Sequence, residues 1–172
     1  MELGITWPLQ RLLRIAVPYG NERENGFCWD AHCITLHGKS SLLLVHCETR
    51  YSAVLFDLSP PEWERLDEIV SSEIRSCLFD AGLSKEVCHA YCEQAGSIVK
   101  SRTHGRRAVA FLNRAWEDVL AADLLVDPTQ RRQPLLNRCV NRKACRCVGR
   151  DDIASAQEHL EYYFANRKKG TV

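Results

Sequence analysis

A chain of 172 residues with 45% hydrophobic and 26% charged side chains has the composition of a single globular domain, which excludes a disordered or fibrous class. The longest apolar run, residues 42–45, is far shorter than the roughly 20 residues that cross a bilayer, so we expect no membrane span. The net charge is +1. The first residues lack the basic and apolar regions of a signal peptide, so we predict a cytoplasmic location.

Nine cysteines are present, and several fall at apolar positions of predicted strands and helices. Their odd number and these positions favour reduced, buried thiols over a disulfide framework. No C-x-x-C pair occurs, and a strand would place Cys28 and His32 on one face and Cys33 on the other, so we predict no metal and no cofactor. The two groups considered as metal ligands are Cys28, His32, Cys33, His46 and Cys47, and Cys139, Cys145 and Cys147.

The first third of the chain predicts a short helix followed by a sheet. Thr6-Trp7-Pro8 can cap a helix that continues through Ile15, and the polar residues 18–26 are expected to form a mobile loop. Residues 27–36, 41–47 and 51–58 then read as three strands of an antiparallel meander. The middle strand is apolar on both faces, so helices must cover at least one side of this sheet.

The rest of the chain predicts mainly helices. A capping box at Ser59-Pro60-Pro61-Glu62 begins a helix over residues 60–81, and Gly82 can end it. A shorter helix follows from Ser84 to Gly96, then a strand over 97–102, a helix over 105–125, and a basic segment, 127–150, that leads to a C-terminal helix over 151–166. The predicted fold is therefore α+β, a single domain over residues 1–172 in which an antiparallel meander of 3–5 strands packs against 4–5 helices.

Charge is segregated along the chain. Residues 57–93 hold nine acids against three bases, whereas residues 94–116 hold five bases and residues 128–150 hold seven, with no acid in either segment. If the two basic segments meet on one face, they form a positive patch for a phosphate backbone or an acidic protein. The alternative is that they pair with the acidic segment across the fold and with solvent.

The chain contains no G-x-S-x-G, phosphate-loop or H-E-x-x-H pattern, and no catalytic residue is predicted. Polar residues at the ends of predicted elements are the better candidates, because arginines ahead of a helix N-terminus can hold an anion together with the free amides there. The same side chains can also be solvated turn and helix-surface residues. The predicted binding residues are Trp29, His32, Arg50, Arg102, Arg106, Arg107, Asn113, Arg131, Arg132, Arg142, Lys143 and Arg146.

Several of these residues fall in motifs shared with a known family. The opening Pro8-Leu9-Gln10-Arg11-Leu12-Leu13, the stretch Trp29-Asp30-Ala31-His32, the turn Thr49-Arg50-Tyr51 and the run from Arg106 to Leu112-Asn113 resemble an uncharacterised bacterial domain family of unknown function. That family has a Lys/Leu-rich opening helix and a Trp-His-Ala-Asn strand, so Asp30 and His32 depart from its pattern. The resemblance covers roughly residues 1–125 and implies a shared site at Trp29, Arg50, Arg106 and Asn113.

The leading hypothesis is a non-enzymatic regulatory or interaction protein of a bacterium or mobile element, similar to an antitoxin or a defence inhibitor. Its basic surface would bind an acidic macromolecular partner, either nucleic acid or a protein that handles nucleic acid. One alternative is an enzyme acting on a phosphorylated or nucleotide substrate, with Arg50, Arg106 and Arg107 as anion clamps and His32 as acid or base. Another alternative is a metal-supported interaction module.

Overall fold

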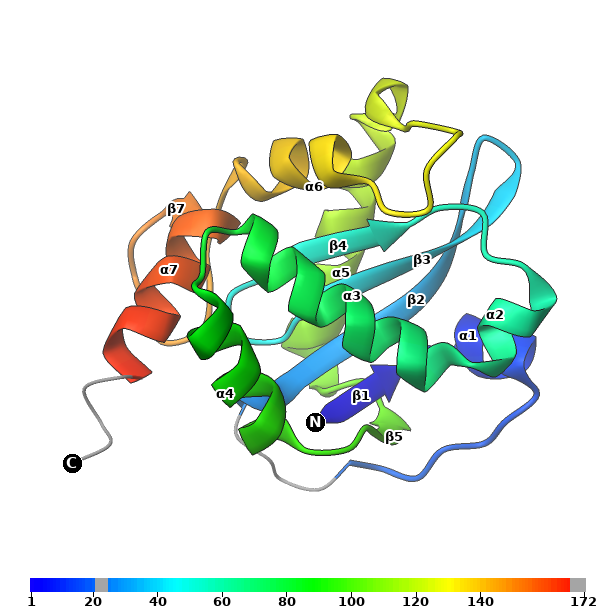
Figure 1. Cartoon of the computed structure of the whole chain (residues 1–172), viewed down its shortest axis with the longest axis horizontal. Coiled ribbons are helices and arrows are strands. Elements are labelled where there is room, and N and C mark those ends of the chain that lie inside the picture. The colour runs from blue at the N-terminus through cyan, green and yellow to red at the C-terminus, as the bar shows by residue number, and fades with distance from the viewer. Residues whose placement is uncertain (21–24, 168–172) are drawn as a thin grey trace.

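The protein, seen in a computed structural model that describes residues 1–20 and 25–167, has an α+β fold built on a five-stranded sheet. The strands lie in the order β4-β3-β2-β1-β5 (Figure 1). Their bounds are β1 Glu2–Ile5, β2 Cys28–Leu36, β3 Lys39–His46, β4 Ser52–Leu55 and β5 Val99–Arg102.

The predicted meander is present as β2, β3 and β4, which pair antiparallel. The expectation of a purely antiparallel sheet is wrong, because β1 lies between β2 and β5 and runs parallel to both. The predicted strand over 97–102 therefore exists as β5, but it joins the sheet through β1. The sheet is mixed, and the carboxyl ends of its three parallel strands, β1, β2 and β5, point to the same end of the sheet.

Alternation along the strands separates two faces of the sheet. Leu3 and Ile5 of β1 and Trp29 of β2 join a core that includes Leu66, Val70, Ile74 and Leu78 of α3. Ile34 of β2 and Leu43 of β3 instead join a core with residues of α5 and α6. Successive side chains of a strand point to opposite faces of the sheet, so residues of the two cores alternate along each strand.

Helices cover both faces (Figure 1). In Figure 1, α3 and α4 lie in front of the sheet and α5 lies behind it. The helices are α1 Trp7–Leu13, α2 Pro60–Glu64, α3 Leu66–Asp80, α4 Lys85–Ala95, α5 Gly105–Leu120, α6 Pro134–Asn141 and α7 Ala156–Arg167. The acidic segment thus forms α2, α3 and α4 on one side, whereas the basic segments contribute α5 and α6 to the other side.

Several helix boundaries differ from the prediction. The capping box of Ser59 and Glu62 is present, but the helix predicted over 60–81 is interrupted at Arg65 and becomes α2 and α3. The helix predicted over 105–125 ends at Leu120 and is followed by a 3-10 turn, Asp123–Leu125. The C-terminal helix begins at Ala156, because residues up to Ser155 form the hairpin of β6 (Ala144–Cys145) and β7 (Ala154–Ser155).

Helix α6 lies inside the basic segment and was not predicted. Pro134 stands in its first turn, and two asparagines on its buried side bond to the edge strand β4. Asn137 Oδ1 accepts from the backbone of Val54 at 2.9 Å, and the Asn141 amide both accepts from and donates to the backbone of Ser52, at 2.8 and 2.7 Å. These side chains satisfy backbone groups that an edge strand otherwise leaves unpaired.

The predicted mobile loop, 18–26, falls partly at residues 21–24, which lie outside the described residues, and its end forms a 3-10 turn, Asn25–Phe27. Of the helices that the structure describes, none combines the length and the apolar character needed to cross a bilayer.

Candidate functional site

Two of the predicted binding residues lie in the interior. Trp29 is fully buried, and its Nε1 donates to the hydroxyl of Tyr91 at 2.9 Å. His32 is also buried, where its Nδ1 bonds to Thr6 Oγ1 at 2.9 Å and its ring meets the edge of Trp116. Burial lowers the pKa of His32. The structure therefore places both residues in packing and hydrogen bonding between elements.

Four of the predicted basic residues form ion pairs with acids. Arg50, in a left-handed turn conformation, donates to Asp118 of α5, and Lys143 reaches the other oxygen of Asp118 at 3.2 Å. Arg131 pairs with Glu62 at 2.8 Å. Arg132 pairs with Glu73 at 2.7 Å and Asp80 at 2.6 Å, and so links the segment before α6 to the acidic helix α3.

The remaining predicted side chains are exposed. Arg102, at the end of the edge strand β5, stacks on the ring of Tyr19, with its guanidinium carbon 4.3 Å from the ring centre. Asn113 lies on the outer side of α5. Exposed arginines also stand on α5, on α6 and shortly after α6; we call this set the basic face, and it comprises Arg106, Arg107, Arg138, Arg142 and Arg146.

No ion pair within the described part of the chain involves an arginine of the basic face. The helices that carry it pack on the same side of the sheet and share one core, which includes Leu112 of α5 and Leu136 of α6. The structure therefore brings parts of the two basic segments into one layer, opposite the layer of α3. It gives Arg131, Arg132 and Lys143 acidic partners instead.

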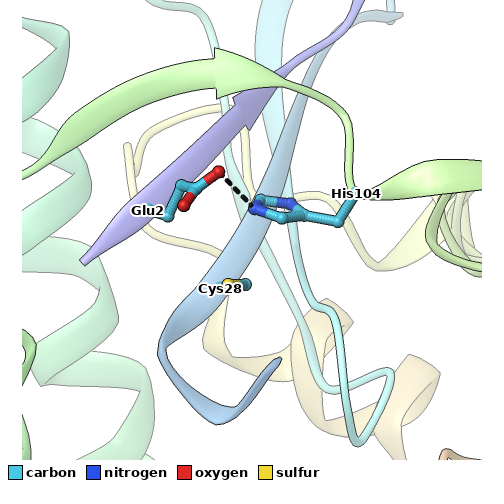
Figure 2. Close-up of side chains that lie close together, drawn as sticks. All are labelled: Glu2, Cys28 and His104. Atoms are coloured by element: carbon cyan, nitrogen blue, oxygen red, sulfur yellow. Dashed lines mark ion pairs between the residues drawn. The ribbon is translucent and has the colours of Figure 1, made fainter. Parts of the chain in front are cut away.

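A second, buried cluster contains residues from four separate parts of the chain, and Figure 2 draws three of its side chains. Glu2 of β1 and Asp30 of β2 are each 1% exposed, and His104 precedes α5. The His104 ring lies between the two carboxylates: its Nδ1 is 2.7 Å from Asp30 Oδ1, and its Nε2 is 3.3 Å from Glu2 Oε1. Two buried thiols, Cys28 and Cys47, complete the cluster, with Cys47 Sγ 3.4 Å from His104 Nδ1.

Strand register explains how these side chains converge. Glu2 is the register partner of Cys28, and Gly4 is the partner of Asp30, so all four positions belong to the same face of the sheet. A β-carbon at Gly4 would lie 2.0 Å from Asp30 Oδ1 and 2.8 Å from His104 Nδ1. Glycine at this position therefore provides the space in which the carboxylate and the imidazole meet.

The electrostatics of the cluster favour a cation at His104. Burial alone lowers the pKa of His104, but hydrogen bonds to Asp30, Cys28 and Cys47 outweigh it and raise the pKa well above its usual range. For Cys47, burial raises the thiol pKa to about 12, although a hydrogen bond with His104 opposes this shift. Cys47 is thus a neutral thiol near pH 7, not an activated nucleophile.

Sequence reasoning missed this cluster because it grouped Cys28 and Cys47 with the wrong neighbours. His32, Cys33 and His46 were considered beside them, but Cys33 packs on the opposite face and His46 bonds to Thr49. Glu2 and His104 gave no signal, since neither was placed in a strand pair or a site. Only the alternation of Cys28 and Asp30 on one strand face could have indicated that the two side chains point the same way.

A mixed five-stranded sheet with helices on both faces makes the chain an α+β protein. The chain belongs to the family of the domain of unknown function DUF6933, whose model matches residues 2–159. The predicted resemblance to an uncharacterised family is thus confirmed, and the match continues past residue 125 to include α6 and the start of α7. A comparison with curated proteins finds no match.

Proposed function

We propose that this protein is a non-enzymatic interaction protein that binds the phosphate backbone of nucleic acid through its basic face. The observation that carries the proposal is the set of exposed arginines on and after α5 and α6, which have no acidic partner among the residues described. Unpaired exposed arginines attract phosphate and bind it through charge-assisted hydrogen bonds.

The distribution of acids supports this choice of surface. Two acidic side chains of α5 lie near the basic face, and both have basic partners: Glu117 pairs with Arg114 at 2.8 Å, and Asp118 pairs with Arg50 and Lys143. The strongly acidic helix α3 lies on the other side of the sheet. Helix α6 contains no acidic residue, so the two helices offer no unpaired carboxylate to these arginines.

The form of the basic face favours backbone contact over base readout. Arg138 stands on the outer side of α6, Arg142 and Arg146 follow that helix, and Arg106 and Arg107 fall in the first turn of α5, at the positive end of its dipole. Contacts of this kind position a protein on a nucleic acid without reading its sequence. We therefore expect little preference among sequences and a strong dependence on salt.

Binding of labelled mixed-sequence DNA and RNA, measured by fluorescence anisotropy across a salt series, tests the proposal. The logarithm of the association constant should fall linearly with the logarithm of the salt concentration, with a slope of about −0.9 for each phosphate neutralised on duplex DNA. The Arg106→Ala/Arg107→Ala variant should weaken binding to all sequences. A matched control, Arg65→Ala/Arg75→Ala, removes two exposed arginines from the opposite layer and should leave binding unchanged.

The proposal fails if the protein binds neither nucleic acid at low salt, or if the salt slope is near zero. It also fails if the Arg65→Ala/Arg75→Ala control weakens binding as much as the Arg106→Ala/Arg107→Ala variant does. That result would mean that overall charge, and not the basic face, governs association.

A further inference from the structure

Two buried polar atoms in the cluster of Figure 2 face each other without a hydrogen bond. They are Oε1 of Glu2 and Nε2 of His104, which lie 3.3 Å apart. Neither has a hydrogen-bond partner within the described part of the chain. They form an ion pair when His104 is protonated, and a metal ion bound to both atoms would take the place of the proton on Nε2.

The hydrogen bonds of His104 decide which ring nitrogen can receive a metal ion. Asp30 Oδ1 lies 2.7 Å from Nδ1 and also accepts from the backbone N–H of His104 at 3.3 Å. An ionised carboxylate can only accept, so Asp30 holds the proton on Nδ1, and the proton that a metal ion must displace is the one on Nε2. Metal-binding histidines commonly show this pattern, in which a carboxylate holds the other ring N–H and orients the imidazole.

Cys28 supplies a third donor close to the Glu2 carboxylate and the His104 ring. The carboxylate of Glu2, the thiol of Cys28 and the imidazole of His104 have ligand atoms that all lie within 4.8 Å of one another. Around a tetrahedral zinc ion with bonds of about 2.0–2.3 Å, two ligand atoms stand about 3.3–3.6 Å apart. The 3.3 Å separation of Glu2 Oε1 and His104 Nε2 already has this value.

A second group, Asp30, Cys47 and His104, also has converging ligand atoms. It is the weaker candidate, because Nδ1 of His104 is engaged by Asp30 at the distance of an ordinary hydrogen bond. Both groups use the same imidazole, that of His104. Asp30 therefore suits the role of orienting His104, and the metal belongs on the Nε2 side.

Backbone packing leaves room for the Glu2 carboxylate. A β-carbon at Gly20 would lie 1.7 Å from Glu2 Oε1, so no larger residue fits at position 20 without moving the carboxylate. Gly20 is itself exposed. The carboxylate oxygen that faces His104 is thus buried against the backbone of an exposed glycine.

We propose that Glu2, Cys28 and His104 bind one Zn²⁺ ion, with Asp30 as the residue that orients the His104 ring. The nitrogen, oxygen and sulfur donors match the borderline character of Zn²⁺, and three protein ligands leave one position for water. Cys28 loses its thiol proton and His104 loses its Nε2 proton to solvent on coordination, since the thiolate and the neutral imidazole nitrogen are the ligands. His104 directly precedes α5, so the ion would also fix the start of the helix that carries Arg106 and Arg107.

Titration of the chelator-treated full chain with Co²⁺, followed by displacement with Zn²⁺, tests this site. We expect one equivalent of Co²⁺ to bind with a thiolate-to-cobalt absorption band that Zn²⁺ abolishes. The Cys28→Ser variant should lose the band and at least tenfold in affinity, and Asp30→Asn should bind about 10–100-fold more weakly. The matched control is Cys33→Ser, which removes the thiol of the same strand on the opposite face and should behave like the wild type.

Two results would overturn the proposal. One is the absence of stoichiometric Co²⁺ or Zn²⁺ binding by the wild type, with protons on both ring nitrogens of His104 by nitrogen NMR in the presence of Zn²⁺. The other is a Cys28→Ser or Glu2→Gln variant that is folded by circular dichroism and binds the ion as tightly as the wild type. Neither readout involves nucleic acid, so this test and that of the basic face succeed or fail independently.

Discussion

Replacing Arg132 with methionine should destabilise the protein strongly, because it leaves a buried carboxylate without its charged partner. Glu73 of α3 is 2% exposed, and its Oε2 accepts from Arg132 Nε at 2.7 Å, while its Oε1 has no hydrogen-bond partner among the described residues. Breaking a buried pair costs about 3–5 kcal/mol. The Arg132 side chain is 38% exposed, so water reduces this cost and we expect about 2–3 kcal/mol at pH 7.

The loss should depend on pH in a defined direction. Burial raises the pKa of Glu73, and the hydrogen bond and charge of Arg132 oppose that shift, so the Arg132→Met variant raises this pKa further. A carboxyl whose pKa is raised on folding favours the folded state when it is protonated, at pH values below its unfolded pKa, and this benefit is lost as the pH rises through the folded pKa. The difference between variant and wild type should therefore be largest at neutral pH and shrink toward pH 4.

Urea unfolding followed by tryptophan fluorescence gives the free energy of unfolding at each pH. The matched control Asp80→Asn removes the other, 38% exposed partner of Arg132 and should cost no more than about 1 kcal/mol. Adding Glu73→Leu to Arg132→Met should recover part of the lost stability, since no buried charge then remains. A loss below about 1 kcal/mol at pH 7, or one that is independent of pH, would refute the reasoning.

Two further changes test the packing that positions the site. Gly4→Ala would place a β-carbon 2.0 Å from Asp30 Oδ1 and 3.0 Å from the backbone of Thr103, so we expect a loss of about 1–3 kcal/mol by urea unfolding; a neutral effect would contradict the close approach. Asn141→Ala removes both hydrogen bonds to the backbone of Ser52 and should cost about 2 kcal/mol and speed amide exchange at Ser52, whereas unchanged exchange there would show that α6 does not protect the edge strand.

The elements that the sequence predicted best are those with strong local signals. The capping box at Ser59, the helix-ending glycines at 82 and 96, both with positive φ, and the apolar middle strand of the meander all appear in the structure. Each of these signals arises from neighbouring residues, whose preferences act within a few positions of the chain.

Elements that depend on distant partners were missed or misplaced. Strand β1 is four residues long and includes Gly4, so its stability comes from parallel pairing on both sides and not from its own sequence. The buried cluster depends on that strand, because Glu2 and His104 are brought together only when β1 lies between β2 and β5. Helix α6 was not predicted, although Pro134 at its start was a local signal for it.

The charge pattern was predictable along the chain but not in space. The sequence left open whether the basic segments pair with the acidic segment or form one face. In the structure Arg131 and Arg132 reach the acids of α2 and α3, whereas the arginines of the basic face do not. A residue's charge is visible in the sequence, but its partner depends on the arrangement of the layers.

The most direct test of the proposed function is the salt slope of duplex DNA binding, measured for the wild type and for the variant Arg106→Ala/Arg107→Ala/Arg142→Ala/Arg146→Ala. If the basic face contacts phosphates, the slope should become shallower by about one for each arginine that contacts a phosphate, and the affinity should fall for all sequences alike. A slope that is the same in the variant and the wild type would contradict the account.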